Sequence, residues 1–306
     1  QFCNLTEVVV RESDTEETLI QKVKLATILG TYQSTLTDFK YLRKIWKYNT
    51  EEERLLGVSL TGIMDNALLS GKSPRIGNNI EGLLTKLRET AVETNRKVSA
   101  KIGIPQSTAV TTVKPSGTVS QLVDSASGIH ARHNPHYIRT VRGDNKDPLT
   151  QFMVAQGIPS EPDVMKPQST TVFSFPMQAP STAVFRQDMT AIEQLNIWLK
   201  YQTYWCEHKP SVTISVKEHE WLEVGAWVYE HFDEVSGISF LPFSEHTYKQ
   251  APYQDCTEVE YKDMLSKMPK GIDWRALSEF EKEDTTSGSR ELACTAGVCE
   301  VVDISA

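Results

Sequence analysis

The chain has 306 residues, of which 39% are hydrophobic and 24% charged, and its formal net charge is −8. This composition is typical of a globular protein and excludes a collagen-like or low-complexity chain. The acidic balance argues against a broad surface for nucleic acid or lipid, so we expect no nucleic-acid and no membrane partner. No apolar run approaches the roughly twenty residues that a bilayer requires, and the acidic N-terminal stretch lacks a signal-peptide core.

The chain opens on a strand followed by a helix. Residues 3–10 (CNLTEVVV) are rich in β-branched side chains, which predicts a strand. Residues 13–30 carry apolar side chains at helical spacing. Ser13 with Glu16 indicates a capping box, and Gly30 suits the C-terminal cap.

The next elements surround a long helix. Asn79 is expected to cap it, and Gly103 with the following proline is expected to end it. Residues 107–113 (STAVTTV) predict a strand, and residues 120–124 (SQLVD) the start of a helix.

The second half of the chain repeats this alternation. Strands that alternate with helices predict an α/β architecture with a parallel sheet or barrel. A polar stretch from about Asp284 (DTTSGSRE) predicts a flexible linker before the last cysteines. The expected elements are strands at 171–175, 211–216 and 237–243 and helices at 188–205 and 217–232.

The sharpest internal motif is KPSGTVS, residues 114–120. Gly117 lets backbone amides approach a ligand closely, and Ser116, Thr118 and Ser120 add hydroxyl groups. Between a strand and a helix start, such a loop can hold an anion such as phosphate. The alternative is an ordinary strand-to-helix turn, which has the same composition.

The segment GIHARHNPHYIRTVR follows closely and is basic. One interpretation is a loop that faces phosphate, and another is a solvated basic loop. A zinc site is a third interpretation, but Pro135 interrupts the histidines and their spacing is unusual for zinc. The residues concerned are His130, His133, His136, Arg132, Arg139 and Arg142.

Five cysteines are too few and too scattered for a secreted disulfide framework, so we expect a cytoplasmic location. Cys294 and Cys299 could form half of a zinc site, completed by Cys3, Cys206, Cys256 or a histidine. They could instead be a dithiol that shuttles electrons. Cys206 and the neighbouring aromatic residues, 198–205, are expected in the core.

Stretches from the first residues to the tail resemble, in order, one family. Their joint occurrence with a terminal Cys–x4–Cys is similar to the C-terminal portion of an adenosylcobalamin-dependent (class II) ribonucleotide reductase. The type it resembles is the monomeric ribonucleoside-triphosphate reductase. The stretches are FCNLTEVV, RLLGVSLTGIMD, TTVKPSGTVSQL, SGIHARHNPHYIRTVR, EHKPSVTISV, GISFLPF and ELACTAGVCE.

The resemblance implies a ten-stranded α/β barrel of ribonucleotide reductase type, to which residues 1–284 contribute the C-terminal part. Residues 285–306 then form a flexible redox-active tail. The implied cofactor is adenosylcobalamin, which generates a cysteine thiyl radical. The implied substrate is a ribonucleotide, whose 2′ carbon is reduced by a pair of cysteines.

The resemblance also implies roles for individual residues. Cys3 matches one member of the reducing pair, and Cys294 and Cys299 match a tail dithiol that a thioredoxin-like reductant reduces. The loop that holds the substrate phosphates matches Ser116, Gly117, Thr118, Val119 and Ser120.

One family motif is missing. The radical cysteine lies in an Asn–x–Cys–x–Glu sequence, which this chain lacks. We therefore expect that the N-terminal half of the enzyme, in the same or a separate chain, is needed and that this chain alone is inactive. Two further hypotheses remain open: a zinc-binding structural module and a non-catalytic nucleotide-binding remnant.

Overall fold

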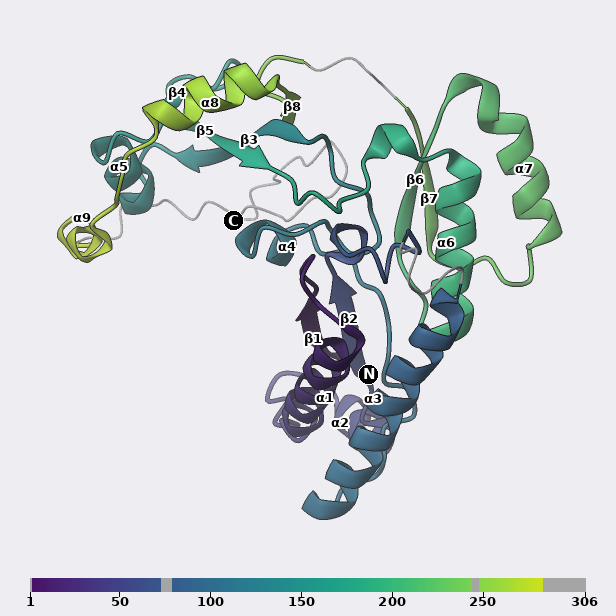
Figure 1. Cartoon of the computed structure of the whole chain (residues 1–306). Helices are drawn as coiled ribbons and strands as arrows, with labels where there is room; N and C mark the ends of the chain where they lie inside the picture. The colour runs from purple at the N-terminus through teal and green to yellow at the C-terminus, as the bar shows by residue number, and fades with distance from the viewer. Residues whose placement is uncertain (1, 73–78, 244–247, 283–306) are drawn as a thin grey trace. The chain divides into compact units, whose positions relative to one another are not determined.

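The computed structural model describes residues 2–72, 79–243 and 248–282, which fold as two compact units (Figure 1). Within the described ranges, the first unit contains residues up to Arg132 and the segment from Ala179 to Phe243. The second unit contains the intervening segment from His133 to Gln178 and the residues after the second gap.

A parallel strand pair forms the centre of the first unit. β1 (Asn4–Val9) pairs with β2 (Leu56–Thr61), and every residue of β2 is buried. On the other edge of β2, Val58 N donates to Val110 O at 2.8 Å and Thr112 N donates to Val58 O at 3.0 Å. β2 is therefore hydrogen-bonded at both edges, while α1 packs against it and its side chains lie in the core.

The strand predicted at 107–113 is an extended segment with a single β-bridge, Thr111 to Val58. It lies beside β2 as expected. Its outer carbonyls accept hydrogen bonds from a loop instead of a strand: Glu207 N and His208 N both donate to Thr111 O at 3.0 Å. These hydrogen bonds from the loop take the place of pairing with a further strand.

α1 (Glu16–Gln33) confirms the first predicted helix but corrects both of its ends. Thr15 is the N-cap, since its hydroxyl accepts from Thr18 N, and Ser13 is not. The helix continues past Gly30 to Ser34. Gly30 lies inside the helix and faces β1 and β2, where a Cβ would make ordinary contacts of 3.5–3.6 Å, so it is not the cap.

α3 (Ile80–Ile102) has both predicted caps. Asn79 Oδ1 accepts from Gly82 N at 3.2 Å, and Gly103 takes a φ of +74°, a left-handed conformation that favours glycine. α3 packs on α1, and the buried Asn95 donates to Thr31 Oγ1 at 3.0 Å across this contact. The helix that precedes β2, α2 (Lys44–Glu53), was not predicted.

The remainder of the first unit confirms the predicted alternation. β6 (Val212–Val216) and β7 (Ile238–Pro242) pair in parallel, and α7 (Trp221–Glu230) connects them. α6 (Ala191–Tyr204) precedes them and packs on α3 and β6. The short elements of this unit are η1 (Ile63–Asp65), α4 (Val119–Leu122), η2 (Arg186–Asp188) and η3 (Glu218–Glu220).

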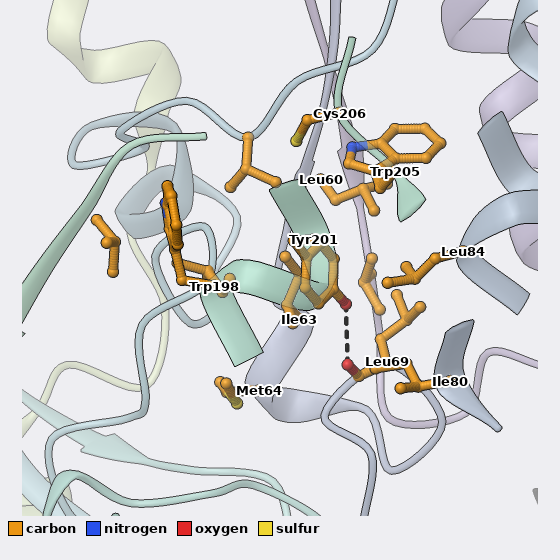
Figure 2. Packing of buried hydrophobic residues seen from close by; sticks show 14 of the residues in the cluster. Leu60, Ile63, Met64, Leu69, Ile80, Leu84, Trp198, Tyr201, Trp205 and Cys206 are labelled. Atoms are coloured by element: carbon orange, nitrogen blue, oxygen red, sulfur yellow. Dashed lines mark hydrogen bonds between the residues drawn. The ribbon is translucent and has the colours of Figure 1, made fainter. Parts of the chain in front are cut away.

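Aromatic residues of α6 fill the core of the first unit (Figure 2). Trp198, Tyr201 and Trp205 are fully buried, as predicted. Each polar atom has a partner: Trp205 Nε1 donates to Thr112 O at 2.8 Å, and Tyr201 Oη donates to Leu69 O at 2.8 Å. Cys206 is also buried, which confirms its prediction as a core residue.

The second unit is an antiparallel sheet with strand order β4-β5-β3-β8. Only β5 was predicted. β3 lies in the basic segment, where charged residues obscured the strand pattern. The elements are β3 (His136–Asp144), α5 (Pro148–Ala155), β4 (Ser160–Pro162), β5 (Thr170–Gln178), β8 (Tyr253–Asp255), α8 (Glu258–Lys267), η4 (Trp274–Ala276) and α9 (Leu277–Phe280).

These sheets and helices confirm an α/β fold. The strands in the described ranges do not close into a barrel, so the ten-stranded barrel stays a prediction. The boundary expected between residues 284 and 285 lies outside the described residues and is untested. Within the described part of the chain, no helix has the length and apolar character needed to cross a membrane.

We expect Tyr201→Phe to lower the free energy of unfolding by about 1–3 kcal/mol, because Leu69 O loses its buried donor. Urea denaturation measures this change. Tyr229→Phe is the matched control, since Tyr229 is 86% exposed and should stay within about 0.5 kcal/mol of the parent. Equal effects of the two substitutions would contradict the assignment.

Candidate functional site

Cys3 lies at the start of β1, and both of its chain neighbours are fixed. Asn4 N donates to Leu55 O at 2.9 Å, which begins the pairing with β2. Phe2 packs against Phe39 and Trp46, with ring centroids 4.9 and 5.2 Å apart. A half-buried cysteine with its neighbours held on both sides has a defined side-chain position.

Gly57 makes room for the sulfur. It stands opposite Leu5 in the β1–β2 register. A Cβ at Gly57 would lie 2.8 Å from Cys3 Sγ and 2.4 Å from Leu5 Cδ2, both closer than real contacts allow. The missing side chain therefore lets Cys3 Sγ occupy the space above β2.

The surroundings of the sulfur are polar on one side. Cys3 Sγ lies 4.0 Å from His208 Nε2, although the two residues are 205 positions apart. Burial raises the pKa of the Cys3 thiol, and the positive charge of Lys114 partly opposes this rise. Near neutral pH the thiol form of Cys3 is therefore favoured unless a neighbouring base takes its proton.

Glu7 connects this strand to the predicted phosphate loop. Its carboxylate accepts from Ser59 Oγ at 3.0 Å and from Ser116 Oγ at 3.2 Å. Burial raises the pKa of Glu7, and the two serine hydrogen bonds partly oppose the rise. The sequence interpretation missed Glu7, although a lone acidic residue inside a β-branched run was a usable signal.

The loop 116–120 turns only its middle outward. Ser116 and Ser120 are 3% and 0% exposed, and Ser120 Oγ donates to Ser116 O. Gly117, Thr118 and Val119 are exposed. The hydroxyl groups of the two serines thus serve the fold in this structure, and a ligand would meet the backbone of the three central residues.

A buried ion pair fixes the far end of this loop. Arg132 is 4% exposed and donates to both carboxylate oxygens of Asp65, from Nε at 2.8 Å and from Nη2 at 2.9 Å. Its Nη1 donates to Asp124 Oδ1 at 2.8 Å. Asp124 has a left-handed φ of +46°, and Arg11 also donates to its carbonyl oxygen at 2.8 Å.

His130 is a structural residue. Its Nδ1 lies 2.9 Å from Ser127 O, and its Nε2 accepts from Thr213 N at 3.0 Å. These partners require the tautomer with the proton on Nδ1. Burial lowers the pKa of His130, so the ring is neutral and unsuited to pair with phosphate.

The other basic residues of the segment lie in the second unit and bind within it. His133 Nε2 lies 2.6 Å from Asp255 Oδ1, Arg139 Nη1 donates to Pro252 O at 2.9 Å, and Arg142 Nε donates to Asp163 Oδ2 at 2.8 Å. The prediction of one basic loop is therefore wrong, because distant carboxyl and carbonyl groups invisible in the sequence pair with its charges.

The remaining cysteines fall into two groups. Cys256 is half-buried, and burial together with Glu260 and Asp255 raises its pKa. Cys294 and Cys299 lie outside the described residues, so their pairing and the zinc alternative stay predictions. In the part of the chain that is described, no three His, Cys, Asp or Glu side chains group as metal ligands.

A hollow of about 710 Å³ lies beside His208 in the first unit. His208 lines it, as does Lys114, which influences the Cys3 thiol. Its lining is otherwise largely charged or polar and includes Gln202, Glu207, Lys209, Asp233, Glu234 and Ser236. The candidate site thus combines a thiol, an imidazole and an outward-facing loop on one strand pair and its neighbours.

Comparison with known proteins confirms the resemblance. The chain is 26% identical to the adenosylcobalamin-dependent ribonucleoside-triphosphate reductase of Euglena gracilis, over 84% of this chain and 37% of that protein. It is 26% identical to the Levilactobacillus brevis enzyme of the same name, over 94% of this chain and 43% of that protein. No protein-family model matches the chain.

A solved structure of a B12-dependent (class II) ribonucleotide reductase has a similar fold. Its TM-score is 0.76 at 24% sequence identity, and the match covers 90% of this chain and 41% of that chain. This chain therefore spans about two fifths of the length of the relatives that it matches.

We expect Arg132→Met to lower the free energy of unfolding by about 3–5 kcal/mol, because it leaves the Asp65 carboxylate buried without its cation. Equilibrium denaturation measures the loss. Arg96→Met removes an exposed pair with Glu93 and should cost less than about 1 kcal/mol. An Arg132→Met variant as stable as Arg96→Met would show that the buried pair does not hold the loop.

Proposed function

We propose that this chain forms part of an adenosylcobalamin-dependent ribonucleotide reductase that acts on ribonucleoside triphosphates. One observation carries the proposal. β1 holds Cys3 at its start and, four residues on, Glu7, whose carboxylate binds Ser116 of the loop. A reducing thiol and a loop for phosphate are thereby attached to one strand, in a chain similar to such reductases over most of its length.

In the proposed reaction Cys3 is one of two thiols that reduce the 2′ carbon of the ribose. The two thiols become a disulfide, their two electrons and two protons are consumed, and the 2′ hydroxyl leaves as water. The shielded position of Cys3 beside Gly57 suits this role, because a half-buried thiol is protected from other oxidants.

Bound adenosylcobalamin would supply the radical that starts the reaction. The described residues do not by themselves fit a radical site, since Cys3 lies outside an Asn–x–Cys–x–Glu sequence. We propose that the radical cysteine and the second thiol come from sequence beyond these 306 residues, and that this chain alone does not turn over.

The exposed centre of the loop is the proposed phosphate site. Gly117, Thr118 and Val119 are exposed, and nothing lies within 4 Å of the position that a Cβ on Gly117 would take. Phosphate oxygens could approach this backbone closely. The bonds from Ser116 to Glu7 and from Arg132 to Asp124 hold the loop at both ends.

The proposed route of electrons to the Cys3 disulfide passes through the tail. Cys294 and Cys299 would attack the disulfide that contains Cys3, and a thioredoxin-like protein would reduce the tail in turn. The reason is access, since exchange needs direct contact between sulfur atoms and the Cys3 sulfur is half-buried. A cytoplasmic location, with its reducing conditions, suits this cycle.

We expect Gly117→Ala to weaken binding of a ribonucleoside triphosphate at least tenfold, or about 1.4 kcal/mol, because the new methyl group would occupy the space of a phosphate oxygen. Isothermal titration calorimetry measures the affinity. The structure leaves this space open, so the thermal midpoint should not change. Gly225→Ala, also with nothing within 4 Å, is the control and should bind as the parent does. Unchanged affinity in Gly117→Ala would remove the loop from the site.

In the assembled reductase we expect Cys294→Ser or Cys299→Ser to abolish multiple turnover with thioredoxin, because the shuttle dithiol is broken. A single turnover of prereduced enzyme should survive, since Cys3 is intact. Quenched-flow measurement of deoxyribonucleotide separates the two regimes, and Cys256→Ser is the control. Steady-state turnover at the parent rate in either tail variant would refute the assignment.

A further inference from the structure

We propose that His208 is the proton acceptor and donor for the Cys3 thiol when that sulfur enters and leaves a disulfide. The inference deepens the proposed function, because it rests on Cys3 as a redox cysteine. It gives a role to His208, which the sequence analysis included in the stretch EHKPSVTISV without a function of its own. It makes His208 a catalytic residue, since its ring contacts the reacting sulfur.

Neighbouring residues position the Cys3 sulfur close to the His208 ring. His208 Nε2 is 4.0 Å from Cys3 Sγ, at the outer limit of a hydrogen bond with sulfur. Gly57 clears the space that lets Sγ stand there, since a Cβ at Gly57 would lie 2.8 Å from it. Catalytic hydrogen bonds are often long in ligand-free enzymes and shorten in the reacting complex.

Backbone hydrogen bonds hold the loop that carries His208. Its own N–H and that of Glu207 both donate to Thr111 O at 3.0 Å, and Thr112 Oγ1 donates to Lys209 O at 3.3 Å. Thr111 and Thr112 belong to the extended segment that lies on β2. The imidazole and the thiol are thus carried on two sides of the same strand, which fixes their spacing.

The chemistry requires a base at this place. The thiolate is the nucleophile in disulfide exchange, and burial opposes its formation at Cys3. Imidazole is the side chain whose unperturbed titration lies near neutral pH. In one direction the Sγ proton moves to Nε2 and the thiolate attacks a disulfide, forming one S–S bond and breaking another. In the other direction Cys3 leaves as a thiolate and the imidazolium returns the proton.

The hollow beside His208 gives its ring access to solvent. The ring of His208 can therefore exchange its proton with water. The charges around the pair come from several segments and are of both signs. They are Lys114 on the loop after the extended segment, Glu207 and Lys209 beside His208, Asp233 and Glu234 after α7, and Glu7 on β1.

The test measures the reactivity of Cys3 without nucleotide or cobalamin. In the 306-residue chain, Cys256, Cys294 and Cys299 are replaced by serine, and the release of thiopyridone from 4,4′-dithiodipyridine is followed from pH 5 to 10. A Cys3→Ser version of the same protein gives the background of buried Cys206. Reaction forms the mixed disulfide of Cys3 and releases one thiopyridone, so the amount of thiopyridone gives the number of thiols that have reacted.

We expect His208→Gln to slow this reaction about tenfold at pH 7, the effect of a thiol pKa higher by about one unit. The two rates should approach each other only at the alkaline end of this range, where hydroxide begins to remove the proton in both proteins. His219→Gln, an exposed histidine of the same unit, should leave the profile unchanged. Thermal melting of each variant confirms that it is folded.

Two results would overturn the inference: profiles of the parent and His208→Gln within twofold at every pH, or a Cys3 thiol that does not react at all. Either could occur while the assembled enzyme reduces nucleotides, so failure here is separate from failure of the proposed function. Conversely, a chain that binds no triphosphate can still show the His208-dependent profile. The thiol–imidazole pair would then be supported although the proposed nucleotide binding was not.

Discussion

The pairing of β2 on both of its edges is the constraint on which the first unit depends. β1 covers one edge and the extended segment around Thr111 covers the other. Three sequence-distant stretches thereby reach one place: the thiol of Cys3 on β1, the loop that continues from the extended segment, and the loop of His208 that hydrogen-bonds to it. Backbone hydrogen bonds fix the positions of these stretches, and the buried aromatic residues at 198–205 supply the apolar burial that stabilises them.

The charged groups on either side of the loop each have several partners. Arg132 uses both sides of its guanidinium group, on Asp65 and on Asp124, and Glu7 receives two serine hydroxyls. A buried arginine–carboxylate pair adds little net stability compared with apolar packing, but it enforces one geometry. Here the fixed geometry is the path of the chain before and after the exposed residues 117–119. At this place a single conformation matters more than added stability.

Much of the α/β pattern could be predicted from the sequence, because α1, α3, α6 and β6 carry clear periodicity and caps. β3 could not, since Arg139 and Arg142 made its strand resemble a loop; their partners are a carbonyl and an aspartate distant in sequence. For the site, the family resemblance pointed to Cys3 and residues 116–120. Gly57 and His208 escaped prediction because their roles depend on contacts across tens to hundreds of residues, which local patterns do not encode. Glu7 did leave a local signal, but its partner Ser116 lies far along the chain.

The aromatic packing at the start of the chain gives the protein an optical property. Phe2 is covalently next to Cys3, and its ring lies against the indole of Trp46 on α2. If oxidation draws the Cys3 sulfur toward a second sulfur, any shift passed to Phe2 changes the surroundings of that indole. The emission of Trp46, one of six tryptophans in the chain, would then report whether the thiol just before β1 is reduced or oxidised.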